Sequence, residues 1–219
     1  MYILSKKLDY CEEMDLKQVS LDNIDLSSEN YDRYLFRYGH DSDLIKESIK
    51  KVGLINPVIL RKSRNADETY SVICGYQRIM ACQKLGQVGV EAKVEDGLSD
   101  EEILSLVLHD NLSSRGFNEI EKGIVLKKFL DIGYSYDRLM SEIAPLIEIP
   151  PNKNIINKYI SMLRLDSEIK QAVARGELEL ERAFLLITLD DAERDRGQDI
   201  GGDIGQPRDH EEQLRNDRN

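Results

Sequence analysis

The first half of the chain is organised around residues 69–86, which read TYSVICGYQRIMACQKLG. Side chains over 69–74 follow the period of two that is typical of a strand. Gly75 then breaks the strand, and apolar residues return at helical spacing until Leu85, where Gly86 supplies a helix stop. The segment therefore predicts a strand, a tight turn and a helix in direct succession.

The turn after this strand has the composition of an anion site. A helix leaves the amide groups of its first turn without intrahelical acceptors, and its dipole favours negative charge at that end. Arg78 falls in this first turn, where its guanidinium can bond two phosphate oxygens. A glycine between a strand and a helix is also a common turn device that needs no ligand, so residues 75–78 alone leave both interpretations open.

The segments on either side continue the mixture of strands and helices. Ser99 with Glu102, and Asn118 with Glu121, form capping boxes that open two helices. The expected strands cover 17–21, 58–60 and 88–94, and the expected helices cover 42–53, 99–111 and 118–132. These elements predict a small mixed sheet with helices packed against it.

The second half of the chain is periodic only at helical spacing. Helices are expected at 135–147, 152–165, 167–176 and 180–189. The fold class is thus α+β, with a small mixed-sheet domain followed by an all-α domain of the helix-turn-helix type. The last residues carry too few apolar side chains to offset the entropy of ordering. We divide the chain into an N-terminal extension (1–40), the mixed domain (41–116), the helical domain (117–189) and a disordered acidic tail (190–219).

Charge and composition exclude several classes of protein. The chain has 219 residues, of which 30 are basic and 41 acidic, and its formal net charge is −11. This charge argues against a surface that binds polyphosphates everywhere, although a local basic face is compatible with it. The sequence has no apolar run long enough for a membrane span, no secretion signal, and no Cys cluster among its three cysteines. We therefore expect a reduced cytoplasmic protein with no membrane partner, no disulfide framework and no zinc site.

Two further segments carry polar groups that suit a nucleotide. Residues 53–57, GLINP, join a helix to a strand, and their backbone and the Asn56 amide can contact a nucleobase. Asp110 and Asn111 close a helix, where a carboxylate beside an amide can hold a hydrated Mg²⁺ that bridges phosphates, with Arg115 adding positive charge. A plain connection and a solvated helix end are the alternatives for these two segments.

Taken in order, these segments resemble the N-terminal domain of the ParB family of DNA partition proteins. In that family they read roughly GxxxP, GERRxRA, ENxQR and LNPIE. Here they are GLINP (53–57), GYQRIMA (75–81), DNLSSR (110–115) and FNEIE (117–121). The resemblance extends over about residues 44–189. It implies a fold related to sulfiredoxin, a pocket for CTP and Mg²⁺, and a dimeric clamp that closes around DNA.

The resemblance assigns site residues by position. Asp110 stands where the family has a metal-binding glutamate. The nucleotide-binding residues that it implies are Arg37, Gly53, Asn56, Pro57, Gly75, Tyr76, Gln77, Arg78, Asn111 and Arg115. Tyr76 replaces the family's glutamate, and Gln77 and Met80 replace two arginines, so fewer fixed charges compensate a triphosphate. We therefore expect nucleotide binding with at most weak CTP hydrolysis.

The helices expected at 135–147 and 152–165 have the order of a helix-turn-helix motif. In such a motif the second helix lies in the DNA groove, and its polar residues contact phosphates and base edges. The stretch 152–164 contains three basic residues and no acid. The predicted DNA-binding residues are Asn152, Lys153, Asn154, Asn157 and Lys158. An ordinary helical bundle with a solvated face is the alternative.

The sequence as a whole predicts a ParB-like DNA-binding protein for chromosome or plasmid partition or for DNA-linked regulation. The implied partners are double-stranded DNA, a second copy of the chain and a ParA-type ATPase, with the protein on the nucleoid in the cytoplasm. One alternative is a nucleotide-independent regulatory or interaction module on the same fold, and another is a nuclease or phosphotransferase. A sulfiredoxin-like redox enzyme is disfavoured, because Tyr76 stands at the cysteine position and Cys74 lies among apolar strand residues.

Overall fold

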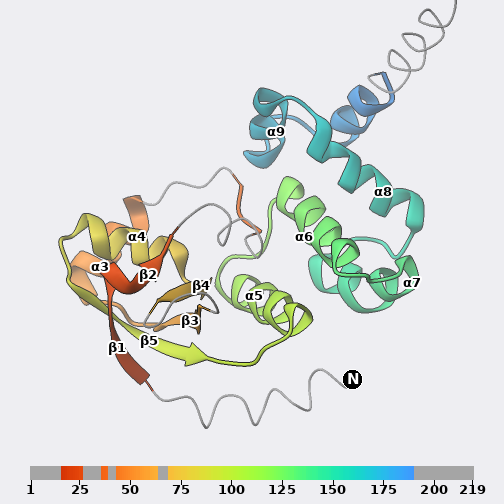
Figure 1. Ribbon diagram of the computed structural model, residues 1–219. Coiled ribbons are helices and arrows are strands. Elements are labelled where there is room, and N and C mark those ends of the chain that lie inside the picture. Colours follow the sequence, from red (N-terminus) through yellow and green to blue (C-terminus); the bar gives the residue numbers. More distant parts are fainter. Residues whose placement is uncertain (1–15, 27–35, 39–42, 64–68, 190–219) are drawn as a thin grey trace, which may run out of the picture.

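The computed structural model describes residues 16–26, 36–38, 43–63 and 69–189 (Figure 1). The strands are β1 (Leu16–Ser20), β2 (Ile24–Asp25), β3 (Val58–Lys62), β4 (Tyr70–Cys74) and β5 (Gly89–Glu95). The helices are α3 (Asp43–Val52), α4 (Tyr76–Lys84), α5 (Asp100–Ser114), α6 (Glu119–Asp131), α7 (Tyr136–Arg138), α8 (Lys153–Ser161) and α9 (Ser167–Ala174), with a further helix over 180–189. Short turns of other helix types are η1 (Leu21–Asn23), η2 (Leu139–Ile143), η3 (Ala144–Ile147) and η4 (Met162–Arg164). None of the helices in these ranges has the length and apolar character needed to cross a membrane.

The sheet has the strand order β1-β5-β3-β4-β2 and contains both pairing directions. β1 with β5 and β3 with β4 are antiparallel, whereas β3 with β5 and β2 with β4 are parallel. Helices α3 and α4 contact each other and lie together beside the sheet (Figure 1). The predicted α+β class with a small mixed sheet is confirmed.

The N-terminal stretch supplies two strands of this sheet. β1 lies within one residue of the strand predicted at 17–21. β2, which the sequence analysis did not predict, pairs with β4 and has only 2 residues, too few to show a period of two. The part of the predicted extension over 16–26 therefore belongs to the sheet. The predicted tail over 190–219 and residue 42, the first residue of the helix predicted at 42–53, lie outside the described residues.

Alternating strand residues form an apolar core between the sheet and its two helices. Val58 and Leu60 of β3 are fully buried, as are Ile79 and Cys82 of α4, and all four belong to one apolar cluster. Successive strand residues point to opposite faces, so the alternation in β3 places both of its buried side chains on the face toward α4. Burial of this apolar surface contributes roughly 25 cal/mol per Å² to the stability of the sheet half.

Both predicted capping boxes are present and open α5 and α6. The Ser99 hydroxyl accepts from the backbone N–H of Glu102, whose carboxylate accepts from the backbone N–H of Ser99 at 3.0 Å. Asn118 and Glu121 repeat this pair of bonds at the start of α6. α5 continues past residue 111 to Ser114, so the Asp-Asn pair at 110–111 lies inside the helix and not at its end.

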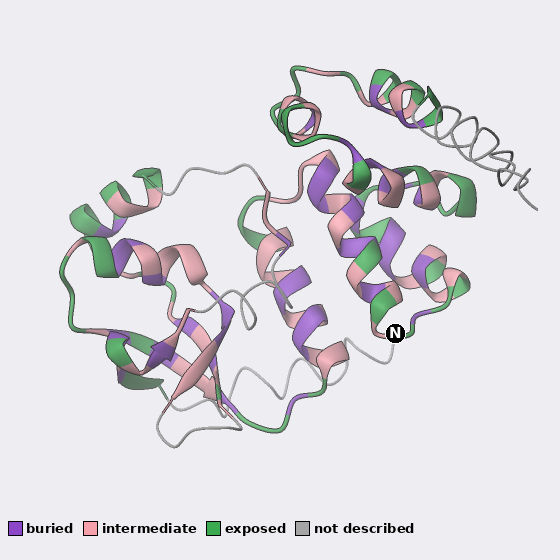
Figure 2. Ribbon diagram, turned by 45° about the horizontal axis from the view of Figure 1, so that its top comes forward, coloured by how far each residue is buried: buried purple, intermediate pink, exposed green. Residues whose placement is uncertain are grey.

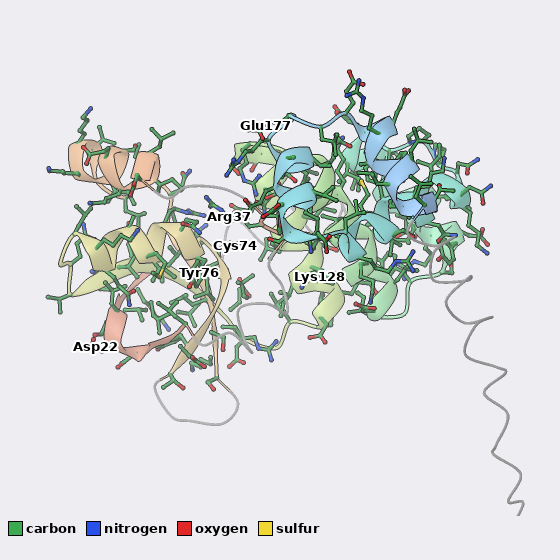
Figure 3. All side chains as sticks on the ribbon, turned by 90° about the horizontal axis from the view of Figure 1, so that it is seen from above. Asp22, Arg37, Cys74, Tyr76, Lys128 and Glu177 are labelled. Carbon is green, nitrogen blue, oxygen red and sulfur yellow. The ribbon has the colours of Figure 1, made fainter. Side chains whose placement is uncertain are left out.

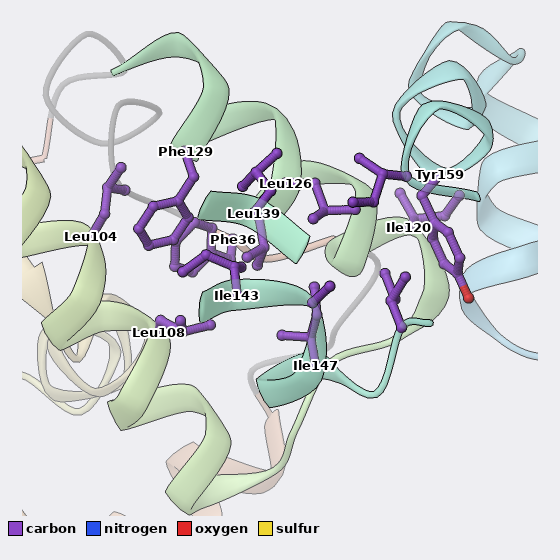
Figure 4. Packing of buried hydrophobic residues seen from close by; sticks show 14 of the residues in the cluster. Phe36, Leu104, Leu108, Ile120, Leu126, Phe129, Leu139, Ile143, Ile147 and Tyr159 are labelled. Atoms are coloured by element: carbon purple, nitrogen blue, oxygen red, sulfur yellow. The ribbon is translucent and has the colours of Figure 1, made fainter. Parts of the chain in front are cut away.

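The helical half is built around a larger apolar cluster (Figure 4). Phe36 is fully buried there and stacks on Phe129, with ring centroids 6.5 Å apart and planes at 17°. Leu104 and Leu108 of α5 line the same cluster, which also includes Cys74 at the end of β4. Buried residues recur along the inner side of α5, which thereby joins the sheet to the helical half (Figure 2). The domain boundary predicted at 116/117 stays a prediction.

The segment predicted as a helix-turn-helix has an irregular first helix and a regular second one. α7, the π-helical turn η2 and the 3-10 turn η3 follow one another without a break. Pro145 has no N–H to donate, so it interrupts the regular bonding of an α-helix, and Glu148 ends the stretch with φ of 57°. After the turn, Asn152 caps α8.

Helices α6 and α8 cross at very short distance. A Cβ added at Gly123 would lie 2.5 Å from the carbonyl oxygen of Tyr159, so the two backbones approach closely only because residue 123 is glycine. The hydroxyl of Tyr159 donates to a carboxylate oxygen of Glu119 at 2.6 Å. These contacts fix the position and rotation of α8 on α6.

Candidate functional site

The turn of residues 75–78, called the Gly75 turn below, has a backbone that suits only glycine. Gly75 has φ of +95°, in the left-handed region that is unfavourable for residues with a Cβ. A Cβ at this position would lie 2.8 Å from Cγ1 of Val58 and 3.1 Å from Nε of Arg78. Steric packing therefore requires glycine here, whether or not a ligand binds.

The first turn of α4 places backbone donors next to a positive charge. Gly75 is the N-cap and supplies no side-chain hydrogen bond, and helix geometry leaves the first-turn N–H groups without intrahelical acceptors. Tyr76, Gln77 and Arg78 fill this turn and are half-buried. Such a helix start suits an anion, although the arrangement is common in proteins.

Arg78 joins three segments that lie far apart in the sequence. Its Nη1 donates to the carbonyl oxygens of Asn56 at 2.8 Å and Pro57 at 2.9 Å. Its Nη2 lies 3.6 Å from Oδ2 of Asp110 on α5. The loop before β3, the Gly75 turn and α5 therefore meet at one guanidinium, and we call this meeting point the Arg78 junction. These contacts bring together four of the predicted site residues, namely Asn56, Pro57, Arg78 and Asp110.

Asp110 and Asn111 contribute the oxygen atoms of the junction. The Asp110 side chain is 38% exposed and remains accessible to a ligand. Nδ2 of Asn111 donates to the carbonyl oxygen of Val107 at 2.8 Å, which leaves its Oδ1 as an acceptor. The described residues contain no group of three His, Cys, Asp or Glu side chains that could hold a metal ion by themselves. Because Mg²⁺ at nucleotide sites takes one or two carboxylates together with phosphate oxygens, Asp110 fits this metal only alongside a nucleotide.

Cys74 ends β4 immediately before the Gly75 turn. Burial raises the pKa of its thiol, the negative charge of Asp110 raises this pKa further, and Arg78 acts in the opposite direction. The thiol therefore stays protonated at neutral pH, and a protonated thiol is a poor nucleophile. In Figure 3, Cys74, Tyr76 and Arg37 are labelled between the sheet half and the helical half. The expectation that Cys74 is a buried, unreactive thiol agrees with this environment.

Arg115 is held at the connection between α5 and α6. Its Nη1 and Nη2 donate to the two carboxylate oxygens of Glu121 at 2.8 and 2.9 Å. The Glu121 side chain is 0% exposed and also accepts from the backbone N–H of Tyr38 at 2.9 Å. Asn118 donates its Nδ2 to the carbonyl oxygen of Tyr38 at 3.0 Å. Arg115 thus has a structural role as the partner of a buried carboxylate, and its nucleotide contact stays a prediction.

Gly53 and Arg37 are two further residues that the sequence assigns to the nucleotide site. Gly53 follows α3 with φ of +77°, and no atom lies within 4 Å of a Cβ added there, so glycine is needed for its backbone conformation alone. Arg37 follows the buried Phe36 and is itself half-buried. Their roles in nucleotide binding stay predictions.

The N-terminal part of α8 carries the predicted DNA-binding residues on its accessible side. We call this surface the recognition face, and it consists of Asn152, Lys153, Asn154, Asn157 and Lys158. Oδ1 of Asn152 accepts from the backbone N–H groups of Asn154 at 2.9 Å and Ile155 at 3.3 Å. Asn152 is therefore the N-cap of α8, and four of the five residues are exposed while Asn157 is half-buried.

Aromatic side chains from neighbouring helices support the recognition face. Nζ of Lys153 lies 4.7 Å from the ring centroid of Tyr136, and Nζ of Lys158 lies 5.3 Å from that of Phe184. The Tyr136 hydroxyl donates to Oδ1 of Asn157 at 2.7 Å. A cation above an aromatic ring is attracted by the ring quadrupole, so these rings hold both ammonium groups near α8.

The charge around the recognition face is positive. The stretch 152–164 has no acidic residue. Glu119 approaches α8 from α6, where its two carboxylate oxygens accept from Tyr159 at 2.6 Å and from Lys122 at 2.9 Å. Burial and the neighbouring Glu119 raise the pKa of Tyr159, so its hydroxyl remains a donor. The carboxylate is thus paired within the protein, and the recognition face keeps its positive charge.

Comparison with known sequences places these features in a family. The sequence matches the ParB N-terminal domain family over residues 6–112. This range contains the loop before β3, the Gly75 turn and the Asp-Asn pair of α5. Residues 6–112 form a divergent ParB N-terminal domain.

Curated relatives extend this similarity across the helical half. A probable chromosome-partitioning protein ParB from Chlamydia muridarum is 26% identical over 182 residues, which cover 82% of this chain and 62% of the relative. A nucleoid occlusion protein from Oceanobacillus iheyensis is 28% identical over 175 residues, which cover 78% of this chain and 57% of the relative. The chain therefore spans about three fifths of the length of these ParB-family relatives.

A solved structure shares the fold. The pNOB8-like ParB-N domain has a TM-score of 0.51 and 18% sequence identity, and the match covers 86% of this chain and 82% of that chain. At this level of identity the comparison supports the arrangement of elements and carries no information on individual site residues.

Two residues of the chain have roles that the sequence alone did not predict. Glu121 was expected only to complete a capping box, but it also binds Arg115 inside the protein. Tyr136 was not singled out, yet its ring and hydroxyl contact two members of the recognition face. The capping box is the sequence signal that marks Glu121, whereas no local sequence pattern indicates that Tyr136 contacts α8.

Proposed function

We propose that this ParB-family chain binds double-stranded DNA through the recognition face of α8 and uses CTP with Mg²⁺ at the Arg78 junction as a switch of a DNA clamp. The cellular task would be chromosome or plasmid partition or DNA-linked regulation. The observation that carries the proposal is the recognition face, where five polar residues start a capped helix with no acid among them. Lysines contact phosphates without regard to sequence, and asparagine amides can read base edges.

The geometry of the junction suits a nucleotide phosphate. Arg78 lies in the first turn of α4, whose N–H groups lack intrahelical acceptors, and its Nη2 lies 3.6 Å from Oδ2 of Asp110. Arg78 orients the loop carbonyls of Asn56 and Pro57 while its Nη2 remains near Asp110. A bound Mg²⁺ would neutralise part of the phosphate charge, with Asp110 as its protein ligand and the Asn111 side chain in contact with the phosphates. Gln77 and Met80 add no positive charge, so we expect at most weak CTP hydrolysis.

The relatives support the proposed setting and partners. One is described as a chromosome-partitioning protein and another as a nucleoid occlusion protein, which fits a protein on the nucleoid in the cytoplasm. A second copy of the chain would complete the clamp, and a ParA-type ATPase is the partner expected of a partition protein. The net charge of −11 would repel DNA from most of the surface and orient the recognition face toward it.

One alternative has support in the contacts of the arginines. Arg78 donates to two backbone carbonyls and Arg115 to a buried carboxylate, so both guanidinium groups already have protein acceptors. These bonds favour a DNA-binding module on the same fold that works without a nucleotide. DNA affinity measured with and without CTP separates the two candidates, because the module binds DNA equally in both conditions.

Salt-dependent DNA binding tests the proposal. Affinity for a pool of random-sequence duplexes is measured by fluorescence anisotropy at several salt concentrations, for wild type, Lys153→Ala and Lys158→Ala. Each variant is expected to bind more weakly on all sequences and to lower the slope of log affinity against log salt by about 1. Lys127→Ala, an exposed lysine of α6 paired with Asp131, is the matched control and is expected to bind as wild type. Unchanged affinity and slope for both α8 variants would contradict the assignment of the recognition face.

A further inference from the structure

Tyr136 contacts two residues of the recognition face at once. It is the first residue of α7, its ring lies beneath Nζ of Lys153 at 4.7 Å, and its hydroxyl donates to Oδ1 of Asn157 at 2.7 Å. Lys153 and Asn157 are four residues apart and therefore share one side of α8. A single aromatic side chain thus sets the position of a charged group and of an amide on the side that faces DNA in the proposed function.

The packing of α8 on α6 leaves Asn157 half-buried and fixes the direction in which its side chain points. Ile156 and Tyr159 are buried in the apolar cluster of the helical half, and Tyr159 is tied to α6 by its bond to Glu119 and by the close approach to Gly123. α8 cannot rotate to present the Asn157 amide differently without breaking these contacts. The Asn157 side chain is consequently oriented by packing on one side and by the Tyr136 hydroxyl on the other.

The bond from Tyr136 determines which atoms Asn157 can offer. An asparagine amide has an oxygen that accepts and an NH₂ group that donates twice. A free asparagine can pair with adenine through both atoms, accepting from N6 and donating to N7. Here the Tyr136 hydroxyl donates to one lone pair of the oxygen and holds that oxygen toward α7, and within the described part of the chain Nδ2 of Asn157 donates to no other group. The amide therefore presents its donors outward.

We propose that Tyr136 is a positioning residue that turns the amide donors of Asn157 toward base edges. The base it recognises presents acceptors in the major groove, as guanine does through N7 and O6 and thymine through O4. Adenine, which needs an acceptor on the protein for its N6 amino group, is disfavoured at the contacted position. This inference rests on the proposed DNA-binding function and specifies the chemistry of its readout.

The test is a selection of binding sites from a random duplex library with wild type and Tyr136→Phe. Phenylalanine retains the ring beneath Lys153 and removes only the hydroxyl, so the fold and the salt dependence of binding are expected to stay as in wild type. The freed amide can then pair with adenine, and the preference for guanine or thymine over adenine at one position is expected to fall about tenfold. Lys153→Ala is the matched control, with weaker binding, a lower salt slope and an unchanged base preference.

Base analogues at the selected position distinguish the two acceptor bases. If guanine is selected, 7-deazaguanine, which lacks the N7 acceptor, is expected to weaken wild-type binding. If thymine is selected, uracil retains O4 and is expected to bind as thymine does. Asn157→Asp, which replaces the donors by acceptors in the same shape, is expected to lose the preference entirely.

The possible outcomes separate this inference from the function on which it rests. A base preference that is identical in wild type and Tyr136→Phe would overturn the positioning role of Tyr136 and leave DNA binding by α8 intact. An unchanged preference in Asn157→Asp would overturn it as well. A wild-type protein that binds duplex DNA in no condition would instead overturn the proposed function, and the readout with it.

Discussion

The Gly75 turn and the recognition face of α8 are built from different parts of the chain. In the Gly75 turn the backbone is decisive, because φ of +95° and the 2.8 Å approach to Val58 require glycine. In the recognition face the backbone is an ordinary helix, and side chains from other helices orient the functional groups. A site of the first kind leaves a readable pattern in the local sequence. A site of the second kind depends on contacts that exist only after the helices have packed.

The two regions also share one structural link. α5 carries Asp110 of the Arg78 junction, and the pair Arg115–Glu121 joins the end of α5 to the start of α6, on which α8 lies. Substitutions at the link, at the Gly75 turn and at the α6–α8 crossing therefore separate what each place contributes to stability and to DNA binding.

Loss of the buried carboxylate at the link is expected to have the largest effect. Glu121→Ala removes the carboxylate that pairs with Arg115 and that accepts hydrogen bonds from the backbone N–H groups of Tyr38 and Asn118. Breaking a buried pair in this way costs about 3 to 5 kcal/mol. Urea denaturation measures the free energy of unfolding. Glu168→Ala, on the exposed side of α9, is the control and is expected to change it by less than about 0.5 kcal/mol. A loss below about 1 kcal/mol for Glu121→Ala would contradict the structural role of the pair.

A side chain at the Gly75 turn is expected to be the next most damaging change. Gly75→Ala forces a residue with a Cβ into the left-handed region and against buried Val58, at a combined cost of about 2 to 3 kcal/mol. Gly86→Ala is the matched control, because Gly86 has φ of +72° and no atom within 4 Å of an added Cβ. The control is expected to lose only about 1 kcal/mol. Equal losses in the two variants, measured by chemical denaturation, would show that the contact with Val58 is unimportant.

At the crossing of α6 and α8, Gly123→Ala tests the recognition face in the way that Gly75→Ala tests the Gly75 turn. In Gly123→Ala the new Cβ meets the carbonyl oxygen of Tyr159 at 2.5 Å, so α8 must move away from α6. Overpacking of this kind costs about 2 kcal/mol, and the displaced helix is expected to lose DNA affinity as well. Both quantities are measured on the same preparation, with Lys127→Ala as the exposed control on α6. Full DNA affinity in Gly123→Ala would contradict the view that this crossing positions α8.

The smallest expected effect is a dependence of stability on alkaline pH. Burial raises the pKa of Cys74, so above the ordinary thiol pKa of about 8.5 the unfolded chain loses a proton that the folded chain keeps. The free energy of unfolding therefore falls as pH rises, by about 1 kcal/mol between pH 9 and 10 from this group. Cys74→Ala is expected to be less stable at pH 7 but to show a correspondingly smaller decline. An identical decline in both proteins would exclude Cys74 as its source.

The sequence was sufficient for the parts of the fold that local chemistry controls. The period of two over residues 69–74, the glycine stops, and the capping boxes at Ser99 and Asn118 all correspond to elements in the structure. The motif order also predicted that the loop before β3, the Gly75 turn and Asp110 belong together, and Arg78 joins them.

Other features depended on contacts between distant residues. Arg115 was assigned to the nucleotide from its position in a motif, and its bidentate bond to Glu121 follows from how α5 and α6 pack. β2 is too short for any periodic signal and forms because it pairs with β4. The role of Tyr136 requires the tertiary arrangement of α7 and α8, which local sequence does not encode.

The most direct test of the account is isothermal titration of CTP in Mg²⁺ buffer, with ATP, GTP and UTP for comparison. We predict that wild type binds CTP selectively and that Arg78→Ala abolishes binding, since this change removes the guanidinium that joins the loop, the turn and Asp110. Lys153→Ala, on the recognition face, is predicted to bind CTP as wild type does. Wild-type protein that binds no nucleotide, or Arg78→Ala that binds CTP with unchanged affinity, would contradict the assignment of the Arg78 junction as the nucleotide site.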